Sequence, residues 1–187
     1  MEENRVILDA ARFRLTIDRL CYQLIETFDD LRNTCLIGIQ PRGVPLSDVL
    51  KKRLHEILGH SAFDYGKLDI TFYRDDYRTR DKPLAASKTV MDFLVDGKNV
   101  VLVDDVLYTG RTVQAAMTAL NDFGRPARVE LLALVDRRFN RHLPIQADFI
   151  GLRVDSLDEA YVKVQWDPAG EENKILIFPD KNSAFDS

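Results

Sequence analysis

The most constraining feature of this 187-residue sequence is an apolar run that leads into two adjacent acids and then into a glycine-containing turn. Residues 100–113 read Val-Val-Leu-Val-Asp-Asp-Val-Leu-Tyr-Thr-Gly-Arg-Thr-Val. The apolar run predicts a buried strand over residues 98–103, and the spacing of the later apolar residues predicts a helix over residues 112–123. In an open α/β sheet, ligands bind at the carboxyl ends of the strands, so Asp104 and Asp105 are predicted to lie at a binding site.

The turn after these acids is suited to binding a phosphate. Gly110 permits a tight turn, while backbone amides and the hydroxyls of Thr109 and Thr112 can surround a phosphate at the start of the predicted helix. Two acids beside such a turn indicate a ligand with both hydroxyls and phosphate, such as a phosphorylated ribose. An Asp-Asp pair alone could instead end a strand and cap the next helix. The Walker A and dinucleotide patterns are absent, which argues against ATP and NAD binding.

The rest of the chain alternates between helical and extended patterns, without a long linker or a repeat. This alternation predicts one α/β domain over residues 1–187 with a mostly parallel sheet. We expect one helix that begins after a cap at Asp9 and reaches Phe28, and another over residues 46–58 that ends before Gly59. The other expected strands are residues 34–39, 67–73, 128–135, 147–150, 161–166 and 174–178, with a polar loop at residues 74–88.

Composition narrows the class of protein. The first four residues are acidic where a signal peptide is basic, and no apolar run approaches the roughly 20 residues that span a bilayer, so we expect a cytoplasmic protein with no membrane partner. Cys21 and Cys35 lie in apolar runs and form no CxxC, which predicts buried thiols and neither a disulfide nor a zinc site. The net charge of −4 argues against nucleic-acid binding through bulk positive charge but leaves a local basic face open.

Residues 100–113 resemble the phosphoribosyl pyrophosphate (PRPP) signature of type I phosphoribosyltransferases. The resemblance implies their α/β fold, in which helices flank a mostly parallel central sheet beside a small hood region. It implies that Asp104 and Asp105 are catalytic residues on the ribose hydroxyls, and that Mg²⁺ is required without direct ligation by side chains. The PRPP-binding segment implied is Val101, Leu102, Val103, Asp104, Asp105, Val106, Leu107, Tyr108, Thr109, Gly110, Arg111, Thr112 and Val113.

Two further segments resemble parts of the same family. The pyrophosphate loop corresponds to Gln40, Pro41, Arg42 and Gly43. In the family this loop contains a cis peptide, which would here join Gln40 to Pro41, where proline makes the cis form less costly. Residues 69–80 resemble the segment that leads into a mobile catalytic loop, so Arg74, with Arg78 and Arg80, is a candidate cation for the leaving group. On the residues alone, an ordinary turn and a solvated loop remain alternatives.

The resemblance narrows to the PyrR family, which combines uracil phosphoribosyltransferase activity with attenuation of pyrimidine operons, and it covers most of the chain. Purine phosphoribosyltransferases typically have an Asp where this sequence has Tyr108. A tyrosine, with a pKa near 10, cannot replace that carboxylate base at neutral pH, so uracil is the expected base. Asp136 and Arg137 are the implied base pocket, although they could instead cap and surround a turn.

The implied partners are PRPP, uracil and UMP, bound by a homo-oligomer of two or more chains. One alternative function is an RNA-binding attenuator that senses uridine nucleotides, and a less favoured one is purine salvage. In the family, the first helix and the segment after residues 147–150 supply cations to RNA. Here Asp18 lies among Arg12, Arg14 and Arg19, and residues 153–159 contain three acids against one arginine. We therefore expect catalysis with weak or absent RNA binding.

Overall fold

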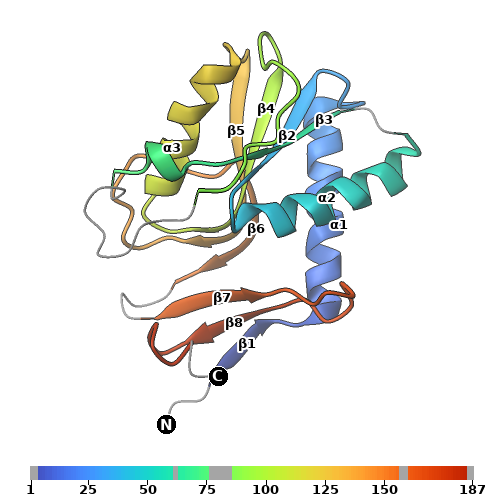
Figure 1. Cartoon of the computed structure of the whole chain (residues 1–187). Coiled ribbons are helices and arrows are strands. Elements are labelled where there is room, and N and C mark those ends of the chain that lie inside the picture. Colours follow the sequence, from blue (N-terminus) through green and yellow to red (C-terminus); the bar gives the residue numbers. More distant parts are fainter. Residues whose placement is uncertain (1–3, 61–62, 76–85, 156–159, 185–187) are drawn as a thin grey trace.

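A computed structural model shows that the protein is built on two β-sheets together with helices (Figure 1). The structure describes residues 4–60, 63–75, 86–155 and 160–184. A five-stranded parallel sheet has the order β3-β2-β4-β5-β6, and a three-stranded antiparallel sheet has the order β1-β8-β7. The small sheet lies beyond the carboxyl ends of the large sheet's strands (Figure 1). This is the position of the hood expected from the sequence.

The elements follow one another with short connections. The strands are β1 (Arg5–Leu8), β2 (Thr34–Ile39), β3 (Asp64–Leu68), β4 (Asn99–Leu107), β5 (Arg128–Arg137), β6 (Phe149–Val154), β7 (Tyr161–Gln165) and β8 (Lys174–Phe178). The helices are α1 (Ala10–Phe28), α2 (Gly43–Leu58) and α3 (Arg111–Leu120), with 3₁₀ turns η1 (Thr71–Tyr73) and η2 (Asn121–Phe123). None of the described helices combines the length and apolar character needed to cross a membrane.

Helices cover both faces of the large sheet, which explains why its central strand is apolar on both sides. Along β4, Val101 and Val103 pack in the core beneath α1 and α2, whereas Val100 and Leu102 pack against the residues of α3. All four side chains are fully buried. Figure 1 shows α3 on the opposite side of the sheet from α1 and α2. Covered on both faces, β4 holds Asp104 and Asp105, near its carboxyl end, in a fixed position.

Local signals place the helix ends as the sequence predicts. The side chain of Asp9 accepts a hydrogen bond from the backbone N–H of Arg12, at 2.9 Å, and so caps α1. Gly59 adopts the left-handed conformation that ends α2, with φ of 71°. Cys21 and Cys35 are buried free thiols, as expected, and burial raises the pKa of each to about 12.

One predicted strand is wrong. Residues 67–73 do not form a single strand, because β3 begins at Asp64 and ends at Leu68, and residues 71–73 form η1. The cause is Asp69, whose Oδ1 accepts hydrogen bonds from the backbone N–H and the hydroxyl of Thr71, at 3.1 and 2.7 Å, and so bends the chain. The predicted loop at residues 74–88 falls mostly outside the described residues.

Other boundaries shift by a few residues. The second helix begins at Gly43 rather than at residue 46, because Pro45 is tolerated within a first helical turn. The third helix ends at Leu120 and continues as η2, and β6 occupies residues 149–154 rather than 147–150. The strand β1 was not predicted. Both β4 and β5 run past their apolar segments and include the polar residues of the expected site.

Candidate functional site

A cavity of about 600 Å³ lies at the carboxyl ends of the large sheet's strands and reaches the small sheet. Its lining comes from segments far apart in the sequence. The lining residues are Gln40, Pro41, Arg42, Ile70, Thr71, Arg74, Asp104, Asp105, Val106, Leu107, Tyr108, Thr109, Gly110, Thr112, Val113, Arg137, Ala160, Tyr161, Val162 and Lys181. Most of the residues predicted from the sequence therefore share one cavity.

Asp104 and Asp105 lie near the end of β4 and line the cavity while remaining almost fully buried, with exposed fractions of 5% and 8%. Both acids accept hydrogen bonds from neighbouring backbone: Asp104 Oδ1 accepts from the N–H of Asp105 at 3.0 Å, and Asp105 Oδ1 accepts from the N–H of Val106 at 2.7 Å. Burial raises the pKa of Asp104 well above its ordinary value, and the charge of Asp105 adds to the effect. Burial also raises the pKa of Asp105, although Arg42 opposes the shift.

Arg42 places a positive charge near the two acids. Its Nη2 donates a hydrogen bond to the hydroxyl of Tyr161, at 3.1 Å, and so connects the loop before α2 to the small sheet. Burial tends to lower the pKa of Arg42, but the nearby Asp105 and Tyr161 raise it overall, with a further contribution from Asp104. The cavity thus combines a fixed cation with two acids, as a ligand with phosphate and hydroxyl groups requires.

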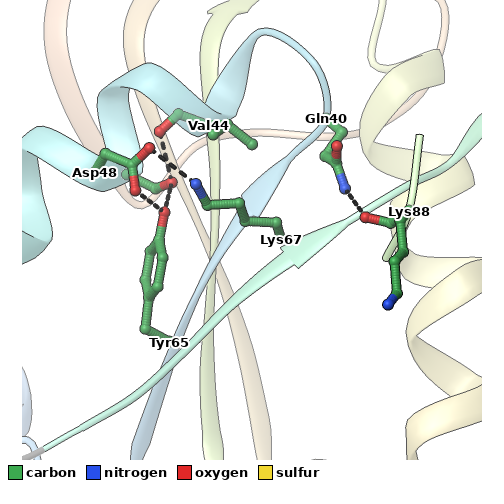
Figure 2. Close-up of polar contacts among 7 residues, drawn as sticks. Gln40, Val44, Asp48, Tyr65, Lys67 and Lys88 are labelled. Carbon is green, nitrogen blue, oxygen red and sulfur yellow. Dashed lines mark hydrogen bonds and ion pairs between the residues drawn. The ribbon is translucent and has the colours of Figure 1, made fainter. Parts of the chain in front are cut away.

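The loop that contains Arg42 is fixed at both ends. The peptide between Gln40 and Pro41 is cis, which confirms the prediction. Gln40 donates through Nε2 to the carbonyl oxygen of Lys88, at 2.8 Å (Figure 2). At Gly43 an added Cβ would overlap the carbonyl oxygen of Val103, so glycine is required for α2 to begin this close to β4.

A polar cluster holds the first turns of α2 against β3 (Figure 2). The hydroxyl of Tyr65 donates to Asp48 Oδ1 at 2.7 Å and lies 2.9 Å from the hydroxyl of Ser47. Lys67 Nζ lies 3.0 Å from Asp48 Oδ2, and Ser47 also donates to the carbonyl oxygen of Val44, at 2.9 Å. Every polar group of the cluster therefore has a partner within the protein. The cluster positions α2, and with it the loop that precedes the helix.

The turn between β4 and α3 has the form expected for a phosphate site. Gly110 has φ of 90°, a conformation that glycine adopts without strain, and it stands directly before the first residue of α3. The carbonyl oxygen of Thr109 accepts hydrogen bonds from the backbone N–H groups of His142 and Leu143, at 3.0 and 3.3 Å. This support from a second loop holds the turn in place at the N-terminus of α3, a position that favours binding of an anion.

The register of the sheet brings Tyr108 and Arg137 together. Leu107 pairs with Asp136 across β4 and β5, so the residues that follow each of them are neighbours. The guanidinium carbon of Arg137 lies 4.0 Å from the centre of the Tyr108 ring, a cation–π contact. Both side chains line the cavity.

Asp136 does not line the cavity, although the sequence predicted it in the base pocket. Its Oδ1 lies 2.5 Å from Arg141 Nη2, and Arg141 also donates to the backbone carbonyl oxygen of Tyr108. The Asp136 carboxylate holds Arg141 in place, and Arg141 in turn holds the backbone of Tyr108. Asp136 therefore has a supporting role and does not face a ligand.

Other predicted residues also lie outside the lining. Val101, Leu102 and Val103 are buried in the sheet, where they position the acids through the backbone. Arg111 forms an ion pair with Asp75 and donates from Nε to His142 Nδ1, at 3.4 Å. Arg74 lines the cavity, whereas Arg78 and Arg80 lie outside the described residues.

The sequence missed the lining residues that come from η1 and the small sheet: Ile70, Thr71, Ala160, Tyr161, Val162 and Lys181. Ile70 and Thr71 lie within residues 69–80, which resemble the segment before the catalytic loop, but neither was singled out as a site residue. The other four belong to no motif. Only the expectation of a hood pointed to this region.

The acids are the only carboxylates among the described lining residues. Among the described residues, no three His, Cys, Asp or Glu side chains form a group that could hold a metal ion by themselves. Two carboxylates are hard oxygen donors that suit Mg²⁺, which usually keeps several waters and binds one or two carboxylates together with substrate phosphates. The cavity therefore fits an ion that arrives with a phosphorylated ligand.

Comparison with known proteins identifies the family and the fold. The model of the phosphoribosyl transferase domain matches residues 4–169. The bifunctional protein PyrR of Caldicellulosiruptor bescii is 40% identical over 177 residues, which cover 95% of this chain and 96% of the relative. That of Picosynechococcus sp. is 47% identical over 158 residues, 84% and 88% of the two chains, and that of Listeria monocytogenes is 42% identical over 181 residues, 95% and 98%.

Solved structures agree on the architecture. A hypoxanthine phosphoribosyltransferase from Staphylococcus aureus has a TM-score of 0.66 at 19% identity and covers 84% of this chain and 79% of its own. The enzyme named hypoxanthine phosphoribosyl transferase from Trypanosoma cruzi has a TM-score of 0.69 at 14% identity, covering 97% and 93%. At these identities the likeness concerns the fold alone, and it confirms the type I phosphoribosyltransferase fold predicted from the sequence.

Proposed function

This chain belongs to the PyrR family of phosphoribosyltransferases, and from that premise we propose that it transfers the ribose 5-phosphate of PRPP to uracil, forming UMP and pyrophosphate. One observation carries the proposal: two buried acids, a supported phosphate turn and a fixed arginine line the same cavity. PRPP has a ribose between two phosphorylated ends, so the acids match the ribose, and the turn and the arginine match the two ends.

The acids would act on the sugar. As the bond between ribose C1 and pyrophosphate breaks, positive charge develops on the ring and negative charge on the leaving group. Asp104 and Asp105 would accept hydrogen bonds from the ribose hydroxyls and stabilise the developing positive charge. Because both carboxylates are buried, their charges act through a medium that screens them much less than water does.

The phosphate groups would be bound at two ends of the cavity. The N–H groups of the turn at Thr109 and Gly110, with the hydroxyl of Thr112, would hold the 5′-phosphate at the N-terminus of α3. Arg42 and Arg74 would face the pyrophosphate and stabilise its charge as it leaves. Mg²⁺, which Asp104 and Asp105 would hold through water, would supply further neutralisation of the diphosphate.

Tyr108 supports uracil as the base. Its ring is held against Arg137, and its hydroxyl accepts a hydrogen bond from Asn140 Nδ2, at 3.4 Å. A phenol in this position cannot take a proton from a purine ring at neutral pH as a carboxylate does. The structural neighbours are named as hypoxanthine phosphoribosyltransferases, but they are less than 25% identical to this chain. Their names therefore do not indicate which base this chain uses.

A base-specificity assay tests the proposal. We expect kcat/KM for uracil to exceed that for hypoxanthine and guanine at least tenfold, with PRPP and Mg²⁺ in each reaction. Tyr108→Phe should retain the preference because the ring remains, whereas Tyr108→Asp should lose activity with uracil. Faster turnover of either purine by the unmodified protein would overturn the assignment of the base.

RNA-dependent regulation is the second candidate, since the relatives are named bifunctional. On α1, Arg14 donates to the carbonyl oxygen of Glu171, and Arg19 donates to those of Ile150 and Gly151. These guanidinium groups are thus partly committed within the protein. Since RNA affinity depends strongly on cations that meet phosphates, we expect binding to be weak.

The acidic segment expected to oppose RNA is described only in part. Arg138 pairs with Asp155, so one cation of this region is neutralised, and residues 156–159 lie outside the described residues. A gel-shift titration against the leader RNA of the pyrimidine operon, with and without UMP, tests the expectation. Nanomolar binding that UMP strengthens would contradict it.

The proposal includes assembly into a homo-oligomer of at least two chains, as the family resemblance implies. Size-exclusion chromatography with light scattering, run over a range of protein concentrations, measures the mass of the assembly directly. A species of one chain's mass at every concentration would contradict this part of the proposal.

A further inference from the structure

The chain beyond β8 folds into a turn at the edge of the small sheet. Asp180 caps this turn: its Oδ1 accepts from the backbone N–H of Ser183 at 2.9 Å, and its Oδ2 accepts from the hydroxyl of Ser183 at 3.1 Å. The backbone N–H of Ala184 donates to the carbonyl oxygen of Lys181, at 3.2 Å. Residues 180–184 therefore have a defined conformation.

The turn is also fixed to the sheet beneath it. Ala184 is completely buried and belongs to a small apolar cluster with Leu176 and Phe178, against which Tyr161 packs. Lys163 on β7 donates from Nζ to the carbonyl oxygen of Ala184, at 2.8 Å. Since both the backbone and the apolar side of the turn are held, the position of Lys181 is set by the fold even though its side chain is exposed.

Lys181 lines the cavity beside residues that reach the pyrophosphate loop. Tyr161, which packs against the same apolar cluster as Ala184, accepts a hydrogen bond from Arg42. The turn, Tyr161 and Arg42 thus form a continuous wall of the cavity. Among the described residues, no carboxylate forms an ion pair with Lys181.

We propose that Lys181 is a substrate-binding residue that contacts the diphosphate of PRPP, an inference that rests on the proposed function. The two acids of the cavity lie on β4 and are assigned to the ribose, whereas Lys181 shares a wall with the cation of the pyrophosphate loop. A diphosphate carries the most concentrated negative charge of the substrate. An ammonium group on a flexible stem binds such a group as a point charge, without the fixed geometry that a guanidinium needs.

The test compares Lys181→Gln with Lys52→Gln, a matched control for an exposed lysine of α2 that does not line the cavity. Lys181→Gln should raise the KM for PRPP and weaken inhibition by inorganic pyrophosphate, each roughly threefold to tenfold, because one charge-assisted contact in a partly exposed site is lost. The kcat, the KM for the base and the affinity for UMP, which has no diphosphate, should stay unchanged. Lys181→Arg should restore most of the loss, and Lys52→Gln should have no effect.

Two outcomes would overturn the inference. Unchanged inhibition by pyrophosphate would show that Lys181 does not contact the diphosphate, and a loss of UMP affinity would place it at the 5′-phosphate or the base instead. Calorimetric binding of PRPP and of pyrophosphate without any base separates this inference from the proposed function. If uracil is not a substrate, the proposed function fails, while the binding measurements still decide the role of Lys181.

Discussion

Two clusters of polar residues lie on either side of the start of α2, and their carboxylates obtain hydrogen-bond partners in different ways. At β3, Asp48 accepts from the hydroxyl of Tyr65 and pairs with Lys67, so its carboxylate is saturated by side chains (Figure 2). At the end of β4, Asp104 and Asp105 are almost fully buried, and they accept hydrogen bonds from the adjacent backbone N–H groups of Asp105 and Val106. Asp48 therefore stabilises the fold, and the acids of β4 are left for a ligand.

The difference teaches that burial and the source of the partners together separate the functional acids from the structural one. Asp48, about half exposed, is bound by side chains of its own cluster, whereas the buried acids of β4 accept hydrogen bonds from neighbouring backbone. A buried carboxylate without a cation in hydrogen-bond contact costs free energy, and the raised pKa values of Asp104 and Asp105 express that cost. Selection retains such an arrangement where a ligand supplies the missing partners.

The largest expected effect comes from removing one charge of the functional cluster. Asp104→Asn and Asp105→Asn should each lower kcat at least tenfold, because a carboxylate is needed on the ribose side of the transition state. Steady-state UMP formation measures the loss, and far-ultraviolet circular dichroism should show an unchanged fold. Near-wild-type turnover in both variants would remove the distinction between the two clusters.

The same substitutions should affect stability in the opposite direction. The folded-state pKa values of both acids are raised, so the folded protein binds protons more tightly than the unfolded chain. The contribution of these two groups to stability is therefore greatest below the unfolded-state pKa of about 4, and it is lost as the pH rises through the raised values.

It follows that Asp104→Asn/Asp105→Asn, without ligand, should unfold at a higher temperature than the unmodified protein at neutral pH. In a chain of this size each kcal/mol corresponds to roughly 2–4 °C. The difference should shrink as the pH falls, because protonation removes the buried charge from the unmodified protein as well. Thermal unfolding followed across this pH range measures it, and a lower unfolding temperature for the variant at neutral pH would contradict the account.

The structural cluster should give a smaller effect, on stability rather than on catalysis. Tyr65→Phe removes a hydroxyl that lies between Ser47 and Asp48, and it should lower the free energy of unfolding by about 1–2 kcal/mol. Urea unfolding measures the change, with Tyr22→Phe on the exposed face of α1 as the control. We expect kcat to change less than twofold. A tenfold loss of kcat in a folded Tyr65→Phe protein would make this cluster part of the catalytic site.

The sequence predicted the functional cluster better than it predicted the cavity around it. The run from Val100 to Thr112 combines a buried strand, two acids and a turn, and local physics places these together. The wall formed by Tyr161 and Lys181 depends on how the small sheet packs, about 50 or more residues away in the chain, and no local pattern encodes it. Asp136 lies outside the lining because it pairs with Arg141, a contact that forms only when the loop after β5 folds back.

The most direct test of the account is proton release on binding PRPP with Mg²⁺, measured by calorimetry in mildly acidic buffers of different ionisation enthalpy. The raised pKa values mean that Asp104 and Asp105 hold their protons to a higher pH than ordinary carboxyl groups do, and hydrogen bonds from the ribose hydroxyls, with the nearby cation, should lower these pKa values. The Asp104→Asn/Asp105→Asn protein, which keeps the phosphate contacts, corrects for protons lost by PRPP itself. The account predicts greater release from the unmodified protein; equal release from both would contradict it.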